Sequence, residues 1–352
     1  MTPRADFPDD VEVAVVAHNN LEPLKDTLQS IADAGCPQDR IIVVDVLSTD
    51  GTGGYLAATW PLVRVIRLTE NKGPSPGRNA GIRAARTRFV LLMDADVVLM
   101  PEAPVRLHAA MVADDTIKVG SPIVVHLGRP DVIQYAGGAL HYICEAVNPW
   151  HDRPLAERGT APLDIGAAPT CALLLDRAAA IEVGLFDERY FIGKEDGDFT
   201  HRIKMAGYRI LERPDAIVKH RSRPRSTWLF YFQIRNRWHF ILKNYQWRTI
   251  VCLIPPLLVH EPLQFAVLVL KGHGWTYVKA VAGLLAMVPS LPRDRALANR
   301  IRRRPDRDLL VSGALIVRDD LAGNALVRYG KAFYERALTA YWQFLRRTVL
   351  AR

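Results

Sequence analysis

Short apolar runs alternate with helical patterns over the first hundred residues of the chain. Residues 11–17 (VEVAVVA), 41–46 (IIVVDV), 63–68 (VRVIRL) and 89–94 (FVLLMD) are rich in Val, Ile and Leu, as buried strands are. The segments between them, 21–35, 52–60 and 77–87, predict helices, and Gly35 ends the first. Strands that alternate with helices predict a parallel, doubly wound sheet with helices on both faces.

The pattern is more mixed in the middle of the chain. Residues 117–125 (IKVGSPIVV) and 216–220 (AIVKH) predict strands, and the segments 176–184 and 198–205 predict helices. Gly207 is the expected end of the last of these helices.

The composition changes after about residue 222. Three tryptophans, Trp228, Trp238 and Trp247, interleave with Arg and Lys, and two apolar stretches follow at 249–270 and 277–292. We therefore expect an α/β domain and a basic, partly apolar helical region. Their bounds are 1–222, with halves at 1–98 and 99–222, and 223–352.

Polar side chains follow the predicted strands where ligands bind in such sheets, at the carboxyl ends. They are His18 and Asn19 after the first strand, Asp45 and the run 48–50 at the second, and Asp94 and Asp96 at the fourth. Two carboxylates close together suit Mg²⁺ or Mn²⁺, which bridge protein carboxylates and substrate phosphates. A solvated loop that caps the next helix would also account for Asp94 and Asp96.

A second acidic group, Glu195, Asp196 and Asp198, lies just before a predicted helix. One carboxylate could be a general base that deprotonates a hydroxyl. Acidic residues at that position are also common helix caps, and Asp198 fits that simpler explanation. The run 48–52 could hold a phosphate or only cap a helix, and His220 could be a ligand or only structural.

Taken together and in order, these segments resemble the inverting family 2 glycosyltransferases of the GT-A fold, in particular their rhamnosyltransferase branch. The resemblance runs from Val11 to His220. It rests on VAVVAHNN, IIVVDVLSTDGT, ENKGPSPGRNAGIRAA, FVLLMDADV, GLFDERYFIGKEDGDFTHRIKMAGYRI and PDAIVKH. It implies the GT-A nucleotide-diphospho-sugar transferase fold, a Rossmann-like mixed sheet, with a nucleotide-binding half at 1–98, an acceptor half at 99–222 and a helical C-terminal extension.

The resemblance also implies roles for individual residues. The nucleotide-binding set would be Ala17, Asn19, Asp45, Asp50, Asn71, Gly73, Arg78, Asn79 and Asp94. Gly73 would let the backbone approach the diphosphate closely. Asp96 and His220 would hold Mn²⁺ or Mg²⁺, and Asp196, paired with Glu195, would be the catalytic base.

The implied reaction is a single displacement that inverts the anomeric carbon of a nucleotide-diphosphate sugar. Asp196 would take the proton of a hydroxyl on a glycan or lipid-linked acceptor. The chain departs from the family in two places: it has Val46-Leu47 where the family has Asn or Asp, and Ala17-His18-Asn19 where it has Thr-Tyr-Asn. The first change removes a polar group from the base pocket.

Charge and cysteine content narrow the cellular setting. The formal net charge is +9, and residues 223–308 hold fifteen Lys and Arg against four Asp and Glu. Four cysteines, without a CxxC pair, fit a reducing cytoplasm. The acidic residues near the N-terminus do not suit a secretion signal. We therefore expect a cytoplasmic protein that binds no nucleic acid, since the basic stretch carries no nucleic-acid-binding motif.

Residues 249–270 are long enough to cross a bilayer, but Pro255, Pro256 and Pro262 should break the helix. His260 and Glu261 at its centre would be costly in hydrocarbon. Two alternatives remain: broken helices in the interface of an anionic membrane on its inner face, or a soluble helical subdomain. After Gly330 an amphipathic helix follows, which either packs on the chain or forms a homodimer.

Two other functions use the same architecture. A sugar nucleotidyltransferase would release pyrophosphate, but no Gly-rich loop follows the first strand. A non-catalytic protein that binds nucleotide sugars would keep the fold without turnover. The complete acidic sets favour the glycosyltransferase.

Overall fold

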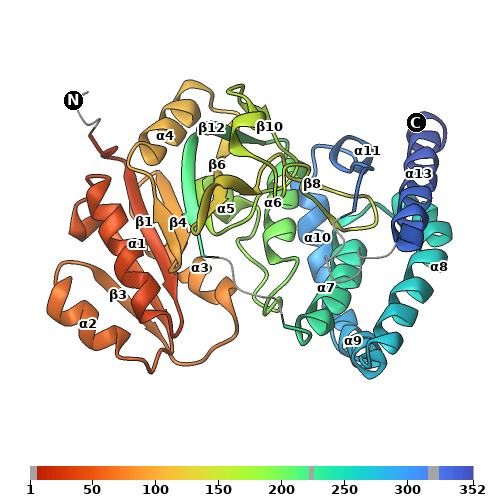
Figure 1. Cartoon of the computed structure of the whole chain (residues 1–352), viewed down its shortest axis with the longest axis horizontal. Coiled ribbons are helices and arrows are strands. Elements are labelled where there is room, and N and C mark those ends of the chain that lie inside the picture. The colour runs from red at the N-terminus through yellow and green to blue at the C-terminus, as the bar shows by residue number, and fades with distance from the viewer. Residues whose placement is uncertain (1–5, 222–225, 316–324, 352) are drawn as a thin grey trace.

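The computed structural model of the chain describes residues 6–221, 226–315 and 325–351. Arg223 and Arg225, which belong to the predicted basic stretch, lie outside the described residues. A mixed sheet with helices on both faces forms one side of the molecule, and a group of helices forms the other (Figure 1). The fold thus has the α/β sheet and the helical C-terminal region that the sequence predicts.

The main sheet has its strands in the order β10-β12-β6-β11-β4-β1-β2-β3, with β5 paired to β12 and β7 to β6. The strands are β1 (Val11–Ala17), β2 (Ile41–Val46), β3 (Arg64–Leu68), β4 (Phe89–Asp94), β5 (Val97–Leu99), β6 (Ile117–His126), β7 (Arg129–Tyr135), β10 (Leu163–Asp164), β11 (Ala172–Asp176) and β12 (Arg209–His220), and β8 (Ala139–Leu140) pairs separately with β9 (Ala146–Val147).

The helices are α1 (Leu21–Asp33), α2 (Thr52–Thr59), α3 (Pro74–Ala84), α4 (Ala103–Ala113), α5 (Arg177–Glu182), α6 (Glu195–Met205), α7 (Leu229–Asn244), α8 (Trp247–Leu270), α9 (Gly274–Leu285), α10 (Leu291–Ile301), α11 (Asp306–Leu309) and α13 (Ala325–Arg347). Short 3-10 turns lie at Gln38–Arg40, Leu155–Arg158 and Val288–Ser290.

The sheet is mixed. β1 pairs in parallel with β2 and β4, β2 with β3, and β12 with β6, whereas β11 runs antiparallel to both β4 and β6. The sheet as a whole is therefore the mixed one that the resemblance implies. The expectation of a parallel, doubly wound sheet holds for residues 1–98 and only in part beyond β4. The alternation of strands and helices that motivated it stops after β4, and antiparallel neighbours need no crossover helix.

Both faces of the central strands are buried, which is why their sequences are apolar without alternation. Val13 and Val15 of β1 pack in the core beneath α1 and α4, and Ala14 and Val16 pack in the core beneath α3 and α6. At Gly77 of α3 a Cβ would come within 2.7 Å of Val16 Cγ1. This glycine lets α3 lie close to β1 at the edge where the polar residues gather.

The helical C-terminal region shares a core with the sheet domain. Ala298, Ile301 and Leu309 belong to the same apolar cluster as Phe199 and Ile203 of α6. The division near residue 222 therefore falls between elements β12 and α7, but the packing continues across it.

Two helix predictions need correction. α6 begins at Glu195, and its N-cap is Lys194, in a left-handed conformation with φ 71°. Asp198 is therefore not the cap, and its carboxylate lies in the interior.

α8 is one continuous helix that contains Pro255, Pro256 and Pro262, so the expected break is absent within it. Leu253 before the prolines, Leu257 between them and Leu268 after them are all buried. Their packing holds the helix to the chain despite the missing backbone donors, which shows tertiary contacts overriding propensity.

The last helix, α13, packs within the chain, as one of the two alternatives predicted. Leu338 and Leu345 are buried, and the Trp342 ring stacks on Tyr142 at 4.7 Å between centroids. The Tyr341 hydroxyl donates to the carbonyl of Cys252. The apolar side of this helix, which could have formed a homodimer contact, thus packs against the same chain.

Candidate active site

The carboxyl ends of β1, β2 and β4 lie side by side, because these strands pair in parallel with Ala17 opposite Asp45 and Val16 opposite Asp94. The end of β12 joins them through β5, where His220 pairs with Val97. The polar residues predicted at the strand ends therefore meet at one edge of the sheet.

Where β1 and β2 end, two predicted residues, Asp45 and Asn19, hold the following loop in place. The buried Asp45 carboxylate accepts from the Ser48 amide at 2.8 Å and from Arg67 at 3.0 Å. Asn19 accepts from the Thr49 amide at 2.8 Å. Ala17 is fully buried at the end of β1.

Asp50 caps two helices at once. One of its oxygens accepts from the Leu21 amide at 2.8 Å, at the start of α1, and the other accepts from the hydroxyl of Thr52 at 2.6 Å, at the start of α2. Burial alone would raise the pKa of Asp50, but these hydrogen bonds outweigh it and lower the pKa. The run 48–52 therefore holds the starts of two helices through Asp50, and its role in binding a phosphate stays a prediction.

Arg78 of α3 joins the two acidic groups. Its buried guanidinium donates to Asp94 at 3.0 Å and to Asp196 at 3.2 Å, and lies 3.8 Å from Glu195. Burial opposes its charge, but the three carboxylates outweigh this and raise the pKa of Arg78. Residues 94 and 196, far apart in the chain, are therefore connected through one side chain.

Asp94 and Glu195 are both difficult to ionise. Burial raises the pKa of Asp94, with Arg78 opposing. Burial and the neighbouring Asp196 carboxylate raise the pKa of Glu195 well above its usual range, again against Arg78. Of the three carboxylates, only Asp196 has a third of its side chain exposed, at 35%. Asp196 is therefore the most exposed of the three carboxylates, ahead of Asp94 at 27%.

Thr170 is a site residue that the sequence did not single out. It is fully buried just before β11, and its hydroxyl donates to the same Asp196 oxygen that Arg78 contacts. A lone Thr outside every recognised motif gives no sequence signal. Only the pairing of β11 with β4 places it beside α6.

Asp96 and His220 come together across β5. The His220 Nε2 atom lies 3.5 Å from an Asp96 oxygen, and Nδ1 lies 2.9 Å from the Gln134 side-chain oxygen. Gln134, which the sequence gave no reason to choose, orients the imidazole so that Nε2 faces the carboxylate. In the part of the chain that the structure describes, no three His, Cys, Asp or Glu side chains form a ready-made metal site.

These two side chains fit a site in which substrate phosphates complete the shell. Mg²⁺ is usually bound by one or two protein carboxylates together with phosphate oxygens and water. An open pocket of about 490 Å³ adjoins His220 and is lined by His126, Leu127, Gly128, Arg129, His220 and Arg221. Space therefore lies beside His220, which in turn faces Asp96.

Three other predicted residues have contacts within the protein. Gly73 has φ 88°, and a Cβ there would lie 2.0 Å from the carbonyl oxygen of Phe191. The close approach expected toward a diphosphate is thus made toward the backbone at Phe191. Asn71 accepts from the Gly73 amide, and the amide group of Asn79 bonds to the Phe186 backbone through both its oxygen and its nitrogen. In this structure Asn79 braces the loop before α6.

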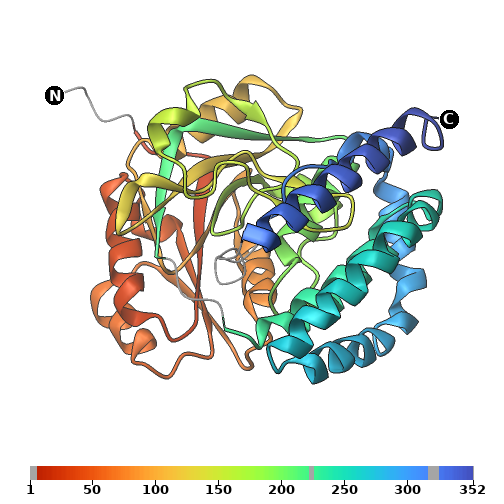
Figure 2. The same cartoon turned by 45° about the vertical axis from the view of Figure 1, so that its right-hand side comes forward.

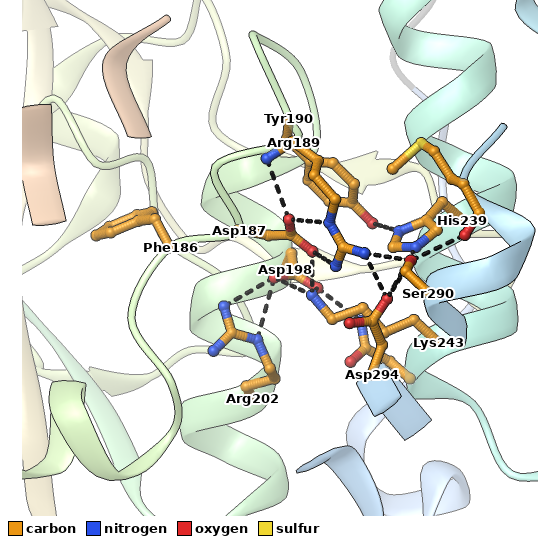
Figure 3. A network of polar contacts seen from close by, with 12 residues as sticks. Phe186, Asp187, Arg189, Tyr190, Asp198, Arg202, His239, Lys243, Ser290 and Asp294 are labelled. Carbon is orange, nitrogen blue, oxygen red and sulfur yellow. Dashed lines mark hydrogen bonds and ion pairs between the residues drawn. The ribbon is translucent and has the colours of Figure 1, made fainter. Parts of the chain in front are cut away.

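Asp198 lies in a buried ionic network that joins the site helix α6 to α7 (Figure 3). Its carboxylate accepts from Arg202 at 2.8 Å, Asn244 at 2.8 Å and Lys243 at 3.0 Å. Burial opposes ionisation, but Arg202 and Lys243 keep the pKa of Asp198 below its usual range.

The network continues into the loop before α6. Lys243 also donates to Asp187 at 2.8 Å, and Arg189 bridges Asp187 to Asp294 of α10. The loop with the sequence FDERYF is therefore held by the C-terminal helices.

This geometry agrees with the comparison to known proteins. Residues 12–180 match the model of glycosyl transferase family 2. The chain thus has a GT-A fold, and it carries a family 2 glycosyltransferase domain. The matches do not single out a rhamnosyltransferase branch.

Two curated relatives illustrate the range of the family. Succinoglycan biosynthesis protein ExoO of Rhizobium meliloti is 34% identical over 146 residues, which are 41% of this chain and 40% of that protein. The pre-mycofactocin glycosyltransferase of Mycobacterium tuberculosis is 30% identical over 226 residues, 61% of this chain and 43% of that protein. The chain spans about two fifths of the length of these relatives.

Solved structures support the fold. GalNAc-T7, solved with UDP, GalNAc and Mn²⁺, has a TM-score of 0.56 and 21% identity, and the match covers 67% of this chain and 48% of that one. Residues 1–349 of Staphylococcus aureus TarS, solved with UDP, have a TM-score of 0.51 and 20% identity, with 96% and 91% covered.

Proposed function

We propose that this chain is an inverting glycosyltransferase. It moves a sugar from a nucleotide-diphosphate donor to a hydroxyl of a glycan or lipid-linked acceptor. The observation that carries the proposal is the bridge from Arg78 to Asp94 and Asp196, which sets a reachable carboxylate opposite the Asp94–Asp96 turn. Names of relatives such as ExoO and the pre-mycofactocin glycosyltransferase point to the same class of reaction.

In this mechanism Asp196 accepts the proton of the acceptor hydroxyl. The acceptor oxygen bonds to the anomeric carbon as the bond from that carbon to the diphosphate breaks, and the electron pair leaves with the diphosphate. The Thr170 hydroxyl and Arg78 hold Asp196 in one orientation. The raised pKa of Glu195 keeps this carboxyl protonated below that pKa. Glu195 therefore does not compete with Asp196 for the proton of the acceptor hydroxyl.

Asp96 and His220 are the residues that would hold Mn²⁺ or Mg²⁺, and such a cation would stabilise the negative charge on the leaving diphosphate. Arg78 supplies fixed positive charge beside Asp94 whether or not a cation is bound. Two of the similar solved structures contain Mn²⁺, which supports the choice of metal for an assay.

The proposal also covers the contacts of the donor base and the location of the enzyme in the cell. Leu47, exposed and with φ 54°, follows Asp45 where the family has a polar pair. A base bound there would contact the leucine side chain rather than a second carboxylate or amide. We place the enzyme in the cytoplasm, in line with its cysteines, none of which forms a disulfide.

The test is nucleotide diphosphate release from UDP-, dTDP- and GDP-sugars with Mn²⁺ and a panel of acceptors. A thermal-shift screen of the three nucleotides selects the donor, since a ligand of the native state raises its stability. Asp196→Asn should lower turnover by about 10²–10⁴-fold, the usual contribution of a general base. Asp96→Ala should lower it too, and added Mn²⁺ should restore less activity than in the wild type.

Asp164→Asn is the matched control. Its carboxylate is 37% exposed, close to the value for Asp196, and is likewise paired to a cation, Lys204. It should leave turnover unchanged. Full activity of both Asp196→Asn and Asp96→Ala would overturn the assignment. Pyrophosphate release from a nucleoside triphosphate would favour a nucleotidyltransferase, and donor binding without turnover would favour a binding protein.

A further inference from the structure

The two polar residues near the centre of α8 face the protein: Glu261 pairs with Arg237 and accepts from Tyr277, and His260 bonds to Tyr334. Many of its large apolar side chains face outward instead. The exposed ones are Trp247, Val251, Ile254, Leu258, Val259, Leu263, Phe265, Val269 and Leu270. His260 and Glu261 therefore do not count against contact with lipid, because both side chains make their polar contacts on the protein side of the helix.

The next helix continues the same surface. Trp275, Val278, Val281 and Leu285 of α9 are exposed, and so is Val288 just beyond it. α8 and α9 lie on the side of the molecule away from α1 and α2 in both views (Figures 1 and 2). We call the exposed apolar side chains of residues 247–290 the α8–α9 face. Monomeric soluble proteins rarely expose contiguous apolar patches of this kind without a partner.

The charges around this face favour an anionic partner. Residues 247–290 contain Arg248, Lys271 and Lys279 but one acid, Glu261, whose carboxylate is bound inside. In the described part of the C-terminal region, the carboxylates of Asp294, Asp306 and Glu335 are also largely buried and paired. Asp308 is more exposed than these three. An apolar surface with basic residues and almost no outward carboxylate matches a bilayer with anionic headgroups.

The helix lies along the surface rather than across it. Within the described residues α8 is the one helix long and apolar enough to cross a membrane. Its inner side is held to the protein along its length, through Thr249, Leu253, Leu257 and Leu268. A helix that is covered by protein on one side from end to end can meet lipid only with its other side.

We propose that the α8–α9 face is a monotopic docking surface for an anionic membrane. Its apolar side chains enter the acyl boundary, and Lys271 and Lys279 remain at the headgroups. This assignment stands independently of the catalytic proposal, because Arg78 and Asp196 bond to each other, to Asp94 and to Thr170, and none of these lies in residues 247–290. It would bring the enzyme to the surface where a lipid-linked acceptor is held.

The experiment is co-sedimentation of the full chain with phosphatidylcholine vesicles, with and without phosphatidylglycerol. The wild type should bind the anionic vesicles more strongly. The double variant Leu258→Glu, Leu270→Glu should reduce that binding at least tenfold. These leucines are 70% and 87% exposed, so the fold should survive the change. Lys271→Glu with Lys279→Glu should remove the preference for anionic vesicles.

Leu62→Glu is the matched control, an equally exposed leucine (65%) in the nucleotide-binding half, and it should bind vesicles like the wild type. Circular dichroism and nucleotide diphosphate release from donor alone check that each variant is folded. A wild type that sediments with neither vesicle overturns the proposal. A second outcome also overturns it: the wild type binds no vesicles, light scattering shows a dimer, and the double leucine variant is a monomer. The α8–α9 face would then contact a second copy of the chain.

Discussion

Arg78 is a single side chain on which three carboxylates of the candidate site depend. Buried cations of this kind are expensive unless each neighbouring charge is compensated. Here the compensation is distributed among Asp94, Glu195 and Asp196, which come from two motifs more than a hundred residues apart. The excess of negative charge leaves Glu195 as the carboxyl that resists ionisation most strongly.

This predicts a pH-dependent effect of Glu195→Gln on stability. The raised native pKa means that, above the usual value of 4.5, the unfolded chain loses this proton while the folded chain keeps it. Glu195 therefore lowers the free energy of unfolding as the pH rises from its unfolded pKa to its native pKa. The loss is about 1.4 kcal/mol for each unit by which the native pKa exceeds the unfolded one. Glu195→Gln should unfold at higher urea than the wild type at pH 8.

The same comparison below pH 4 should show no gain, because Glu195 is then protonated in both the folded and the unfolded chain. Urea unfolding at both pH values measures the difference. Glu157→Gln, which removes an exposed carboxylate, serves as the control and should show no comparable gain at pH 8. A gain for Glu195→Gln that is equal at both pH values would contradict the explanation.

At the scale of elements, the site depends on helices from outside the sheet domain. α6 carries Glu195, Asp196 and Asp198 in its first turn, and Asp198 is bound to Lys243 and Asn244 of α7. The network around Lys243 therefore fixes the rotation of α6 (Figure 3). Positioning of the proposed base is thus shared between the two parts of the chain.

We therefore expect Lys243→Met to be strongly destabilising, by about 3–5 kcal/mol, because it leaves Asp187 and Asp198 with fewer cations in a buried site. Chemical denaturation measures the loss. Lys331→Met is the matched control: it breaks a partly exposed pair with Glu335 on α13 and should cost about 0–1 kcal/mol. Equal effects of the two substitutions would show that the buried network carries no special weight.

Lys243→Arg separates positioning from stability. The arginine keeps the charge but not the geometry, so the folded variant should show reduced turnover with an unchanged Michaelis constant for the donor. A purely structural lysine would lower the amount of folded protein without changing its turnover.

At the scale of the whole molecule, the apolar core is continuous across the proposed domain boundary. Ala298, Ile301 and Leu309 cover the side of α6 that holds Phe199 and Ile203. Removing the C-terminal region would expose this surface and leave Asp198 with Arg202 as its remaining cation.

A chain that ends at residue 221 should therefore fail to unfold cooperatively. Thermal unfolding followed by circular dichroism should give no sharp transition, and the fragment should precipitate at concentrations where the full chain is soluble. Adding residues 226–352 as a second chain during expression should restore a soluble complex. A soluble 1–221 fragment with a sharp transition would show that the sheet domain folds alone.

Much of the fold could be read from local patterns. The strands at 11–17 and 41–46 were predicted with the bounds that the structure gives, because strands buried on both faces are unbroken apolar runs. The start of α6 was misplaced by three residues, and α8 was wrongly expected to break at its prolines. Both errors arise where long-range packing overrides local preference.

The sequence by itself determined that Asp94 ends a strand and that Asp196 lies at the start of a helix, because each of these motifs is contiguous in the chain. The class of site that they form stays a prediction. Tertiary structure alone decided the rest: that Arg78 joins two motifs, that Thr170 and Gln134 orient Asp196 and His220, and that α8 turns its polar side inward. Spacing along a chain fixes which side chains share an element. Which elements meet depends on how the whole chain buries its surface, and no local pattern records that.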